Sequence, residues 1–437
     1  MVNNNGSFQS FGTIRAYEYG THGLEMEVQR EYVMENGISV VLCIALSILS
    51  LSGWPSSDCG TIELVESHPV ETSLDSPALR DTPDVWLELI RNAEDSLKIE
   101  TFYFSEDPLN RDRMDQILDE IDSATIRGVK LRVLSDAGFD ETYPSIRQRL
   151  DSMKHAETRI LDARRFWGGV LHAKFFIVDD LDIFIGSQNW DWRSLEHIRE
   201  LGVHIVDEEA LRTLNSLFQY DWATAGGRKP PADTVYAGPF LLRTANGDTV
   251  SVNMAGSPEN ALPTGFPWDQ PMIIELLDEA VNTIRLHLLT YDPVDEGNGL
   301  YGSFDTALRR AAARGVDIRI IVSDWSKRHS ILPYIQSLAI IPGISVRFTS
   351  IPEWSGGFIP YARVEHPKYC VIDETACWIG TANWNPGSFR SSRNVGLVIK
   401  GEAIAEQVAS FFEMSWNSPY ADPVDPCGEY SPPRRAQ

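Results

Sequence analysis

The chain has 437 residues, of which 43% are hydrophobic and 23% charged, so it is long enough for two domains or one large duplicated domain. Lysine and arginine number 38 against 62 aspartates and glutamates, which gives a formal net charge of −24. A surface this acidic repels polyanions and argues against a protein that coats duplex nucleic acid over many phosphates, but it leaves room for a small basic pocket that takes one phosphodiester. The charge otherwise indicates solubility, or work in an acidic or salty compartment.

The first predicted element is an uninterrupted run of 14 apolar or small residues at 38–51 (ISVVLCIALSILSL). A membrane-spanning helix needs about 20 such residues, whereas the apolar part of a signal peptide needs roughly 7–15. We interpret residues 1–54 as a leader that exports the chain to a secreted or lumenal place. Two alternatives stay open: a short uncleaved anchor that tethers the chain to a membrane surface through residues 38–54, and a buried hydrophobic helix.

Four of the five cysteines lie beyond this leader, and an even number in an exported chain favours disulfide bonds. A zinc site is poorly supported because the sequence has no Cys-x-x-Cys pair. All three pairings remain open for the four, which are Cys59, Cys370, Cys377 and Cys427.

The next elements alternate between helix and strand, which predicts a mostly parallel sheet covered on both faces. Thr82 can cap a helix that has Pro83 at its first position and an apolar stripe up to Ala93. Residues 226–233 (GGRKPPAD) have the composition of a linker, so a boundary is expected near residue 240. Between these points the pattern predicts strands at 97–104, 129–134, 174–178 and 183–185, a helix that ends near 126, a turn at Gly128 and a helix at 208–222.

The second half of the chain repeats the first. The stretch SLKIETFYF at 96–104 is answered by TIRLHLLTY at 283–291, an offset of 187 (283 − 96). LHAKFFIVDD around His172 is answered by EHPKYCVIDE around His366, an offset of 194 (366 − 172), so one insertion separates the two registers. We predict an α/β fold of two homologous α/β/α-sandwich halves, residues 55–240 and 241–437, whose mixed, mostly parallel sheets pack about a pseudo-twofold axis.

Each half carries the same pattern of chemistry-bearing residues at identical spacing. The two copies are His172, Lys174, Asp179, Gly186, Ser187 and Asn189, and then His366, Lys368, Asp373, Gly380, Thr381 and Asn383. Positions i and i+2 of an extended strand point to one face, so each histidine projects together with its lysine. A twofold arrangement of the halves would therefore bring two imidazoles and two ammonium groups to one point.

This set of groups suits the cleavage of a phosphodiester. One imidazole can attack phosphorus while the other protonates the leaving oxygen. The lysines can neutralise the anionic transition state without a metal. A catalytically inactive binding protein is disfavoured because neither copy of the pattern is degraded. The hydroxyls and amides of Ser187, Asn189, Thr381 and Asn383 are predicted to bind phosphate.

Two interpretations of the aspartates in the pattern remain open. Asp179 and Asp373 either close their hairpin turns or support a histidine or lysine of the site from behind. Neither is expected to touch substrate.

These residues match the duplicated His-x-Lys-Asp motif of the phospholipase D superfamily, and the resemblance runs over residues 59–427. It implies a covalent phosphohistidine that water or an alcohol resolves, with no metal and no cofactor. It also implies that a carboxylate at a fixed spacing after the histidine orients the imidazole. Glu200 holds that place after His172 (200 − 172 = 28), whereas Asn394 holds it after His366 (394 − 366 = 28). We therefore expect His172 to be the nucleophile and His366 the acid.

Shorter phrases narrow the resemblance: LVESHP at 64–69, GSQNWDWRSLEHIRELGV at 186–203 and NSPY at 417–420. They are similar to the lysosomal, membrane-tethered branch of animal phospholipase D-like proteins, which implies 5′-exonuclease action on single-stranded nucleic acid. The chain departs from that branch because it has no Asn-x-Ser/Thr acceptor beyond its leader and a shorter apolar segment. We expect exonuclease-type cleavage first, with phospholipase D hydrolysis or phosphatidyl transfer on phospholipids as the alternative.

Aromatic residues are frequent near the motif, where they can stack nucleobases or pack the core. Phe166 and Trp167 are the best candidates for contact with substrate, because Arg164, Arg165 and the glycines of RRFWGG indicate a loop.

Overall fold

The computed structural model describes residues 11–18, 24–33, 39–42, 59–107, 109, 111–140, 142, 144–295 and 299–436. It divides the chain into two compact units, Met1–Asp58 and Cys59–Gln437. In the first unit, an antiparallel sheet is formed by β1 (Phe11–Glu18), β2 (Leu24–Val33) and β3 (Ser39–Leu42).

The apolar run at 38–51 is only partly described. Its residues 39–42 form strand β3, and the rest lies outside the described residues, as do the leader and anchor interpretations that depend on it. Within the described part of the chain, no helix is long and apolar enough to cross a membrane.

The first half of the second unit contains the helices and strands that its sequence predicts, with small shifts at their ends. Asp81 is the N-cap of α1 and Thr82 is its first residue, so the predicted cap is one residue too late. The Thr82 hydroxyl instead donates to the carbonyl of Glu66, at 2.8 Å. The strands are β4 (Thr61–Ser67), β5 (Arg80–Asp81), β6 (Ser96–Thr101), β7 (Phe104–Ser105), β8 (Lys130–Asp136), β9 (Ala156–Leu161), β10 (Phe175–Val178), β11 (Asp182–Gly186), β12 (Trp190–Asp191) and β13 (Ile198–Val206). The helices are α1 (Thr82–Asn92), α2 (Arg113–Arg127), α3 (Ala137–Asp140), α4 (Pro144–Ser152), α5 (Ala163–Trp167), α6 (Trp192–Glu196) and α7 (Glu208–Ala225).

The second half repeats this order. The offset between the first positions of β6 and β16 is 187 (283 − 96), and that between β8 and β19 is the same (317 − 130), whereas that between β10 and β22 is 194 (369 − 175). Its strands are β14 (Phe240–Arg243), β15 (Thr249–Ser257), β16 (Thr283–Leu288), β17 (Val294–Asp295), β18 (Gly299–Leu300), β19 (Asp317–Ser323), β20 (Ile344–Thr349), β21 (Val364–Glu365), β22 (Tyr369–Ile372), β23 (Ala376–Gly380), β24 (Asn394–Lys400) and β25 (Ala421–Pro423). Its helices are α8 (Asp269–Glu279), α9 (Ser303–Ala313), α10 (Leu332–Ala339), α11 (Pro386–Arg390) and α12 (Glu402–Trp416), with 3₁₀ turns at Glu259–Ala261 and Asp324–Lys327.

The two halves have corresponding mixed sheets, which the pairing of β14 with β4 joins into one hydrogen-bonded sheet, and the predicted fold class is confirmed. The first sheet has the order β9-β8-β6-β10-β11-β13-β4, in which β6, β8 and β9 are parallel. The second has the order β20-β19-β16-β22-β23-β24-β15, in which β16, β19 and β20 are parallel. In each sheet the remaining strands are antiparallel, because a hairpin follows each motif histidine.

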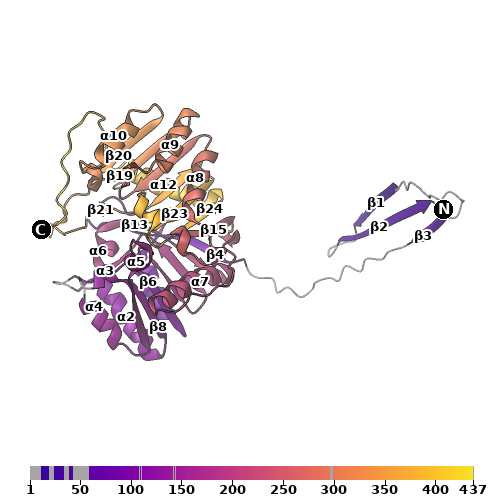
Figure 1. Cartoon of the computed structure of the whole chain (residues 1–437), viewed down its shortest axis with the longest axis horizontal. Coiled ribbons are helices and arrows are strands. Elements are labelled where there is room, and N and C mark those ends of the chain that lie inside the picture. The colour runs from indigo at the N-terminus through magenta and orange to yellow at the C-terminus, as the bar shows by residue number, and fades with distance from the viewer. Residues whose placement is uncertain are drawn as a thin grey trace. The chain divides into compact units, whose positions relative to one another are not determined.

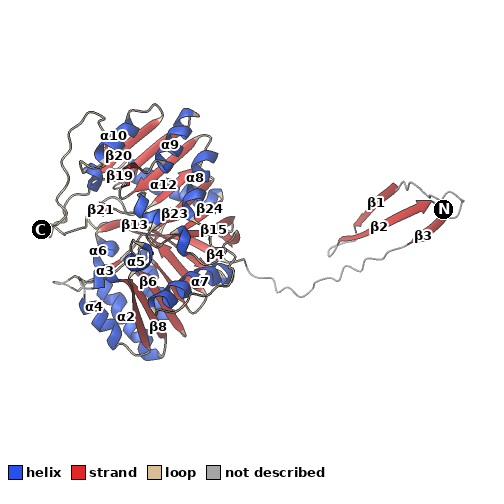
Figure 2. Ribbon diagram, in the orientation of Figure 1, coloured by secondary structure: helices blue, strands red, loops and turns tan. Residues whose placement is uncertain are grey.

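Helices cover both faces of each sheet (Figures 1 and 2). Apolar side chains of α1 and α2 form the outer core of the first half, and those of α8 and α9 form the outer core of the second. Helices α7 and α12 contribute to a third core, which both sheets share, through Phe218, Trp222, Phe412 and Trp416. The two halves therefore pack as one molecule, with their last helices in the shared layer. The division at residue 240 stays a prediction.

The four cysteines of the second unit are free thiols, so the expected disulfides do not form. Cys370 and Cys377 lie on paired strands but one register position apart, because Cys377 is opposite Val371. Since neighbouring positions of a strand face opposite sides, Cys370 packs in the outer core and Cys377 in the shared core.

Candidate active site

The two histidine–lysine pairs occupy equivalent places, immediately before β10 and β22. His172 and His366 are only 9% and 8% exposed. The ammonium groups of Lys174 and Lys368 each donate to the carbonyl of the histidine two residues earlier, at 2.6 Å. The charges of both lysines act on both imidazoles, so the fold gathers the four side chains into one buried centre.

Each imidazole is held by a residue of the opposite half. Nδ1 of His366 lies 2.9 and 2.8 Å from the two carboxylate oxygens of Glu200. Nδ1 of His172 lies 3.0 Å from Oδ1 of Asn394. The expected pairing of Glu200 with His172 is therefore wrong. Glu200 lies on β13, and β13 pairs with β21 of the second half. Because β21 ends directly before His366, this pairing brings Glu200 to His366.

The residues predicted to bind phosphate have two different roles. The Ser187 hydroxyl accepts from the backbone N–H of Leu201, at 3.1 Å, and the Thr381 hydroxyl donates to Oδ1 of Asn394, at 3.0 Å. Both hydroxyls thus hold the strands that carry the histidine partners and are already engaged by protein groups. Asn189 and Asn383 differ, because within the described residues their buried Oδ1 atoms have no hydrogen-bond partner.

One residue of this support was missed by sequence reasoning. The Ser194 hydroxyl donates to Oε1 of Glu200, at 3.0 Å, and fixes the carboxylate that faces His366. The sequence signal available was only its position in the phrase between Asn189 and Glu200.

Asp179 and Asp373 close turns. The Asp179 carboxylate accepts three backbone N–H groups, those of residues 94–96, at 2.7–2.9 Å. The Asp373 carboxylate does the same at residues 281–283, at 2.6–2.8 Å. Both aspartates have positive φ angles, 53° and 51°, at the tips of their hairpins. They lie at the far ends of β10 and β22 from the histidines. They therefore close their turns, and the alternative expectation, that they support a histidine or lysine of the catalytic site from behind, is wrong.

Burial and mutual repulsion control the charges of the centre. Burial, with the charges of Lys174 and Lys368, holds the pKa of His172 well below its ordinary value. Burial lowers the pKa of Lys368 to about 7, against the opposing charge of Glu200. Burial raises the pKa of Glu200 to about 8, against the opposing charge of Lys368. An anion that enters this centre would favour the protonated forms of the lysines and imidazoles.

Known proteins share both the sequence and this architecture. A family model described as "Cardiolipin synthase, PLD-like domain" matches residues 86–222 and 273–416, which include both motif copies. The chain is 30% identical to the 5'-3' exonuclease PLD3 of Bos taurus over 83% of this chain and 80% of that protein. It is 29% identical to phospholipase D Z of Dictyostelium discoideum over 84% of this chain and 92% of that protein. The chain belongs to the phospholipase D superfamily of phosphodiesterases.

A solved structure of the superfamily fold is similar as well. Phosphatidylserine synthase of Haemophilus influenzae aligns with a TM-score of 0.55 and 15% identity, over 78% of this chain and 85% of that one. This likeness concerns the fold.

In this superfamily member an aromatic ring that sequence reasoning missed borders the histidine centre. Phe102 meets His172 edge-on, with ring centroids 5.0 Å apart, and the Lys174 ammonium lies 5.1 Å from the Phe102 centroid. Phe102 directly follows β6, so the end of a parallel strand was the available signal. Of the predicted aromatic contacts, Phe166 is 45% exposed, whereas Trp167 packs under the Arg393 guanidinium, 4.5 Å from it.

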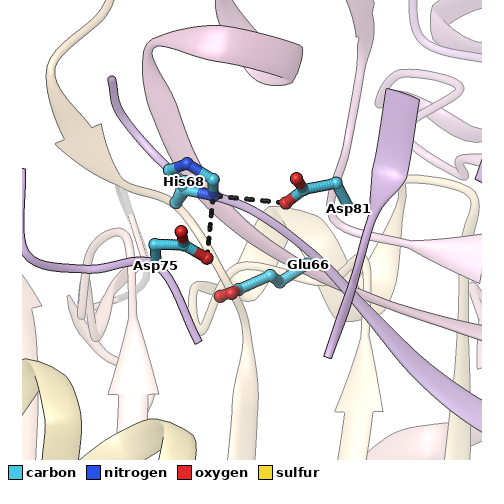
Figure 3. A group of neighbouring side chains, drawn as sticks. All are labelled: Glu66, His68, Asp75 and Asp81. Atoms are coloured by element: carbon cyan, nitrogen blue, oxygen red, sulfur yellow. Dashed lines mark ion pairs between the residues drawn. The ribbon is translucent and has the colours of Figure 1, made fainter. Parts of the chain in front are cut away.

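A second group of polar side chains lies on β4 and the segment after it (Figure 3). Glu66, His68, Asp75 and Asp81 each offer an atom within 4.8 Å of the others, which is a set that could hold a metal ion. His68 Nδ1 lies 3.3 Å from Asp81 and 3.8 Å from Asp75, so these groups pair with one another. Glu66 accepts from the Ser76 N–H and lies 3.6 Å from Arg199. The chemistry of the histidine–lysine centre uses none of these groups.

Proposed function

We propose that this chain is a metal-independent phosphodiesterase that works through a covalent phosphohistidine and shortens single-stranded nucleic acid from its 5′ end. The observation that carries the proposal is the crossed pair of histidine contacts, Glu200 with His366 and Asn394 with His172. Two imidazoles with different partners in one buried centre suit two different tasks.

His366 is the proposed nucleophile. A phosphorylated imidazole ring is positively charged, and the Glu200 carboxylate stabilises that charge in the way a carboxylate stabilises imidazolium in hydrolase triads. Because Nδ1 of His366 is occupied by Glu200, Nε2 is the nitrogen that attacks. This assignment reverses the expectation from sequence, since the carboxylate supports the other histidine.

The two steps balance with these residues and water. Nε2 of His366 forms a bond to phosphorus while the bond from phosphorus to the leaving oxygen breaks, and His172 donates its proton to that oxygen. The now neutral His172 takes a proton from water, the water oxygen attacks phosphorus, and the bond from phosphorus to His366 breaks. Lys174 and Lys368 offset the charge on the non-bridging oxygens, the work that a divalent cation does in other phosphodiesterases.

Nucleic acid is the preferred substrate for two reasons. Several relatives carry the name 5'-3' exonuclease PLD3, including those of Bos taurus and Homo sapiens. The Phe102 ring beside His172 offers a face for a nucleobase, a contact worth about 1–3 kcal/mol per base. Phospholipase D hydrolysis or phosphatidyl transfer is the second candidate, favoured by the relative named phospholipase D Z. A lumenal or secreted location is part of the proposal and rests on the apolar run at 38–51.

The substrate is tested with wild type, His172→Ala and His366→Ala in EDTA at pH 5 and pH 7. The substrates are a labelled 5′-hydroxyl single-stranded oligonucleotide and a fluorescent phosphatidylcholine in mixed micelles. We expect wild type to shorten the oligonucleotide and both variants to lose this activity. Headgroup release without shortening would move the chain to the lipid candidate, and cleavage of neither would refute the proposed substrates.

The two histidine roles are separated with thymidine p-nitrophenyl phosphate, whose p-nitrophenolate leaves without a proton donor. We expect His172→Ala to release one p-nitrophenolate per chain in a burst, because the nucleophile His366 remains. His366→Ala should give no burst. The opposite pattern would assign the nucleophile to His172.

A further inference from the structure

The residue before each histidine partner is an arginine, and its backbone also contacts the histidine of the opposite half. The N–H of His172 donates to the carbonyl of Arg393, and the N–H of His366 donates to the carbonyl of Arg199, both at 2.9 Å. Short parallel bridges accompany these bonds, from Leu171 to Arg393 and from Glu365 to Arg199. Each histidine is thus held twice by one dipeptide, at its backbone by the arginine and at its ring by the next residue.

The Arg393 side chain is anchored on several sides. Its guanidinium is fully buried and binds the Asp221 carboxylate through two bonds, at 2.6 and 2.8 Å. It also donates to the carbonyl of Ser257, at 2.7 Å, and to that of Ala261. Asp221 belongs to α7 of the first half, so Arg393, which directly precedes β24, ties the start of that strand to a helix of the shared core.

Arg199 has the equivalent place in the other direction. Its guanidinium is fully buried, donates to the carbonyl of Leu74 and lies 3.9 Å from the ring centroid of Phe411. It donates to the Phe411 carbonyl at 3.4 Å and faces the Glu66 carboxylate at 3.6 Å. Phe411 belongs to α12 of the second half, so the anchor again crosses between the halves.

We propose that Arg199 and Arg393 are positioning residues, each of which fixes the histidine of the opposite half through the dipeptide that it begins. Burial of a guanidinium adds little net stability, because desolvation offsets most of the attraction to its partners. The planar guanidinium instead makes several directional hydrogen bonds, which fix the position of the backbone at the arginine. A shift there would move a carbonyl and a ring partner together. Only the activity test of this inference rests on the proposed function.

The direct test observes the imidazole nitrogens by NMR in the full chain labelled with ¹⁵N-histidine, with signals assigned from His172→Gln and His366→Gln. We expect Arg393→Gln to shift the nitrogen signals of His172 and to leave those of His366 in place. Arg199→Gln should do the reverse. Arg393→Lys and Arg199→Lys, which keep the charge and lose the fork, serve if the glutamine variants fail to fold, and should show the same pattern.

Arg347→Gln is the matched control. The Arg347 guanidinium donates to the carbonyl of Trp416 and packs 4.4 Å from its ring centroid, without a link to either histidine. We expect this variant to lose stability and to leave both histidine signals unchanged. Equal shifts of both histidines in every variant, or no shift in any, would show that the arginines only stabilise the fold.

Activity separates the two arginines further. A misplaced reactive group costs on the order of 100-fold in rate, so we expect kcat to fall by about that factor with KM nearly unchanged. With a p-nitrophenolate leaving group His172 is not needed as an acid, so the burst of Arg393→Lys should be as fast as that of wild type. The burst of Arg199→Lys should remain slow. If each variant lost the same factor in rate with either leaving group, the assignment of the two arginines to opposite histidines would be wrong. If wild type cleaves no phosphodiester, the proposed function fails while the NMR result still decides the positioning.

Discussion

The two imidazoles of the centre differ in the chemical class of their hydrogen-bond partners, because Glu200 offers a carboxylate where Asn394 offers an amide. A carboxylate stabilises a positively charged ring, whereas an amide oxygen only orients it. This difference makes a functional asymmetry out of two halves that otherwise repeat one another.

Glu200→Gln tests that asymmetry. Glutamine keeps the shape and the acceptor but cannot take the negative charge that a positively charged His366 ring favours on Glu200, so we expect kcat to fall by about 100-fold or more with the fold intact. The measurement is steady-state cleavage of a single-stranded oligonucleotide, with circular dichroism as the check on folding. Glu208→Gln on the exposed start of α7 is the control and should behave as wild type. Full activity of Glu200→Gln would remove the carboxylate from the mechanism.

Anion binding should depend on pH because the empty centre holds its lysines at lowered pKa values. Lys368, with its pKa near 7, is mostly neutral at pH 8 and becomes charged when a bound phosphodiester raises its pKa. Binding therefore takes up protons and tightens as pH falls. Diphenyl phosphate, whose charge is constant in this range, should bind at least about 10-fold more tightly at pH 6 than at pH 8 in calorimetry. An affinity independent of pH would mean that the lysines are already fully charged in the empty centre.

The turn aspartates should matter for stability and not for chemistry. Asp179→Ala and Asp373→Ala each remove three charge-assisted bonds to backbone N–H groups. We expect a loss of about 2–3 kcal/mol in the free energy of unfolding, measured with urea, and unchanged kcat per folded molecule. A large loss of kcat without a loss of stability would restore the interpretation that they support a histidine or lysine of the site.

At the scale of helices and strands, local patterns were the reliable guides. The internal repeat, with its two offsets, placed β6 with β16 and β10 with β22, because alternation and turn residues are properties of short segments. The same reasoning put both histidine–lysine pairs on one face of an extended segment. It could not assign Glu200 to His366, because that contact depends on a pairing between β13 and β21, two strands that belong to different halves of the chain. Pairing over such a distance in sequence leaves no local signal.

The first residue of α8 gives a prediction for pH and stability. Asp269 is fully buried, and burial raises its pKa to about 7, above its value near 3.9 in an unfolded chain. The folded state therefore holds this proton more tightly than the unfolded chain does. The contribution of protonated Asp269 to the free energy of unfolding is lost as pH rises toward and past 7. Between pH 5 and pH 8 this loss amounts to about 3 kcal/mol.

Asp269→Asn removes the titrating group, so the variant should lose less stability than wild type between those two pH values in urea unfolding. Asp278→Asn, a more exposed position on the same helix, is the control and should keep the wild-type slope. Equal slopes for Asp269→Asn and wild type would show that Asp269 is ionised in the folded state.

At the scale of the whole molecule, a strongly acidic chain surrounds a small basic centre. The net charge of −24 repels nucleic acid at long range, while two lysines neutralise the single phosphodiester that is cleaved. This arrangement suits an enzyme that engages one end of a strand and releases it, because affinity from many phosphate contacts would slow each turnover. Recognition must then come from the cleaved phosphate and from groups beside it, such as the Phe102 ring.

Salt dependence distinguishes this arrangement from a general nucleic-acid binder. A single strand that releases about one counterion per neutralised phosphate gives a slope of roughly −0.7 for each contact in a log–log plot of affinity against salt. With one or two contacts, kcat/KM for a 20-nucleotide strand should fall by about 3- to 7-fold at most between 50 and 200 mM NaCl, and relief of the long-range repulsion should reduce the fall further. A dinucleotide, which has one phosphodiester, should show nearly the same slope. A loss of about 100-fold for the long strand alone would require a basic track along the surface, and the acidic chain would then have to bind many phosphates at once.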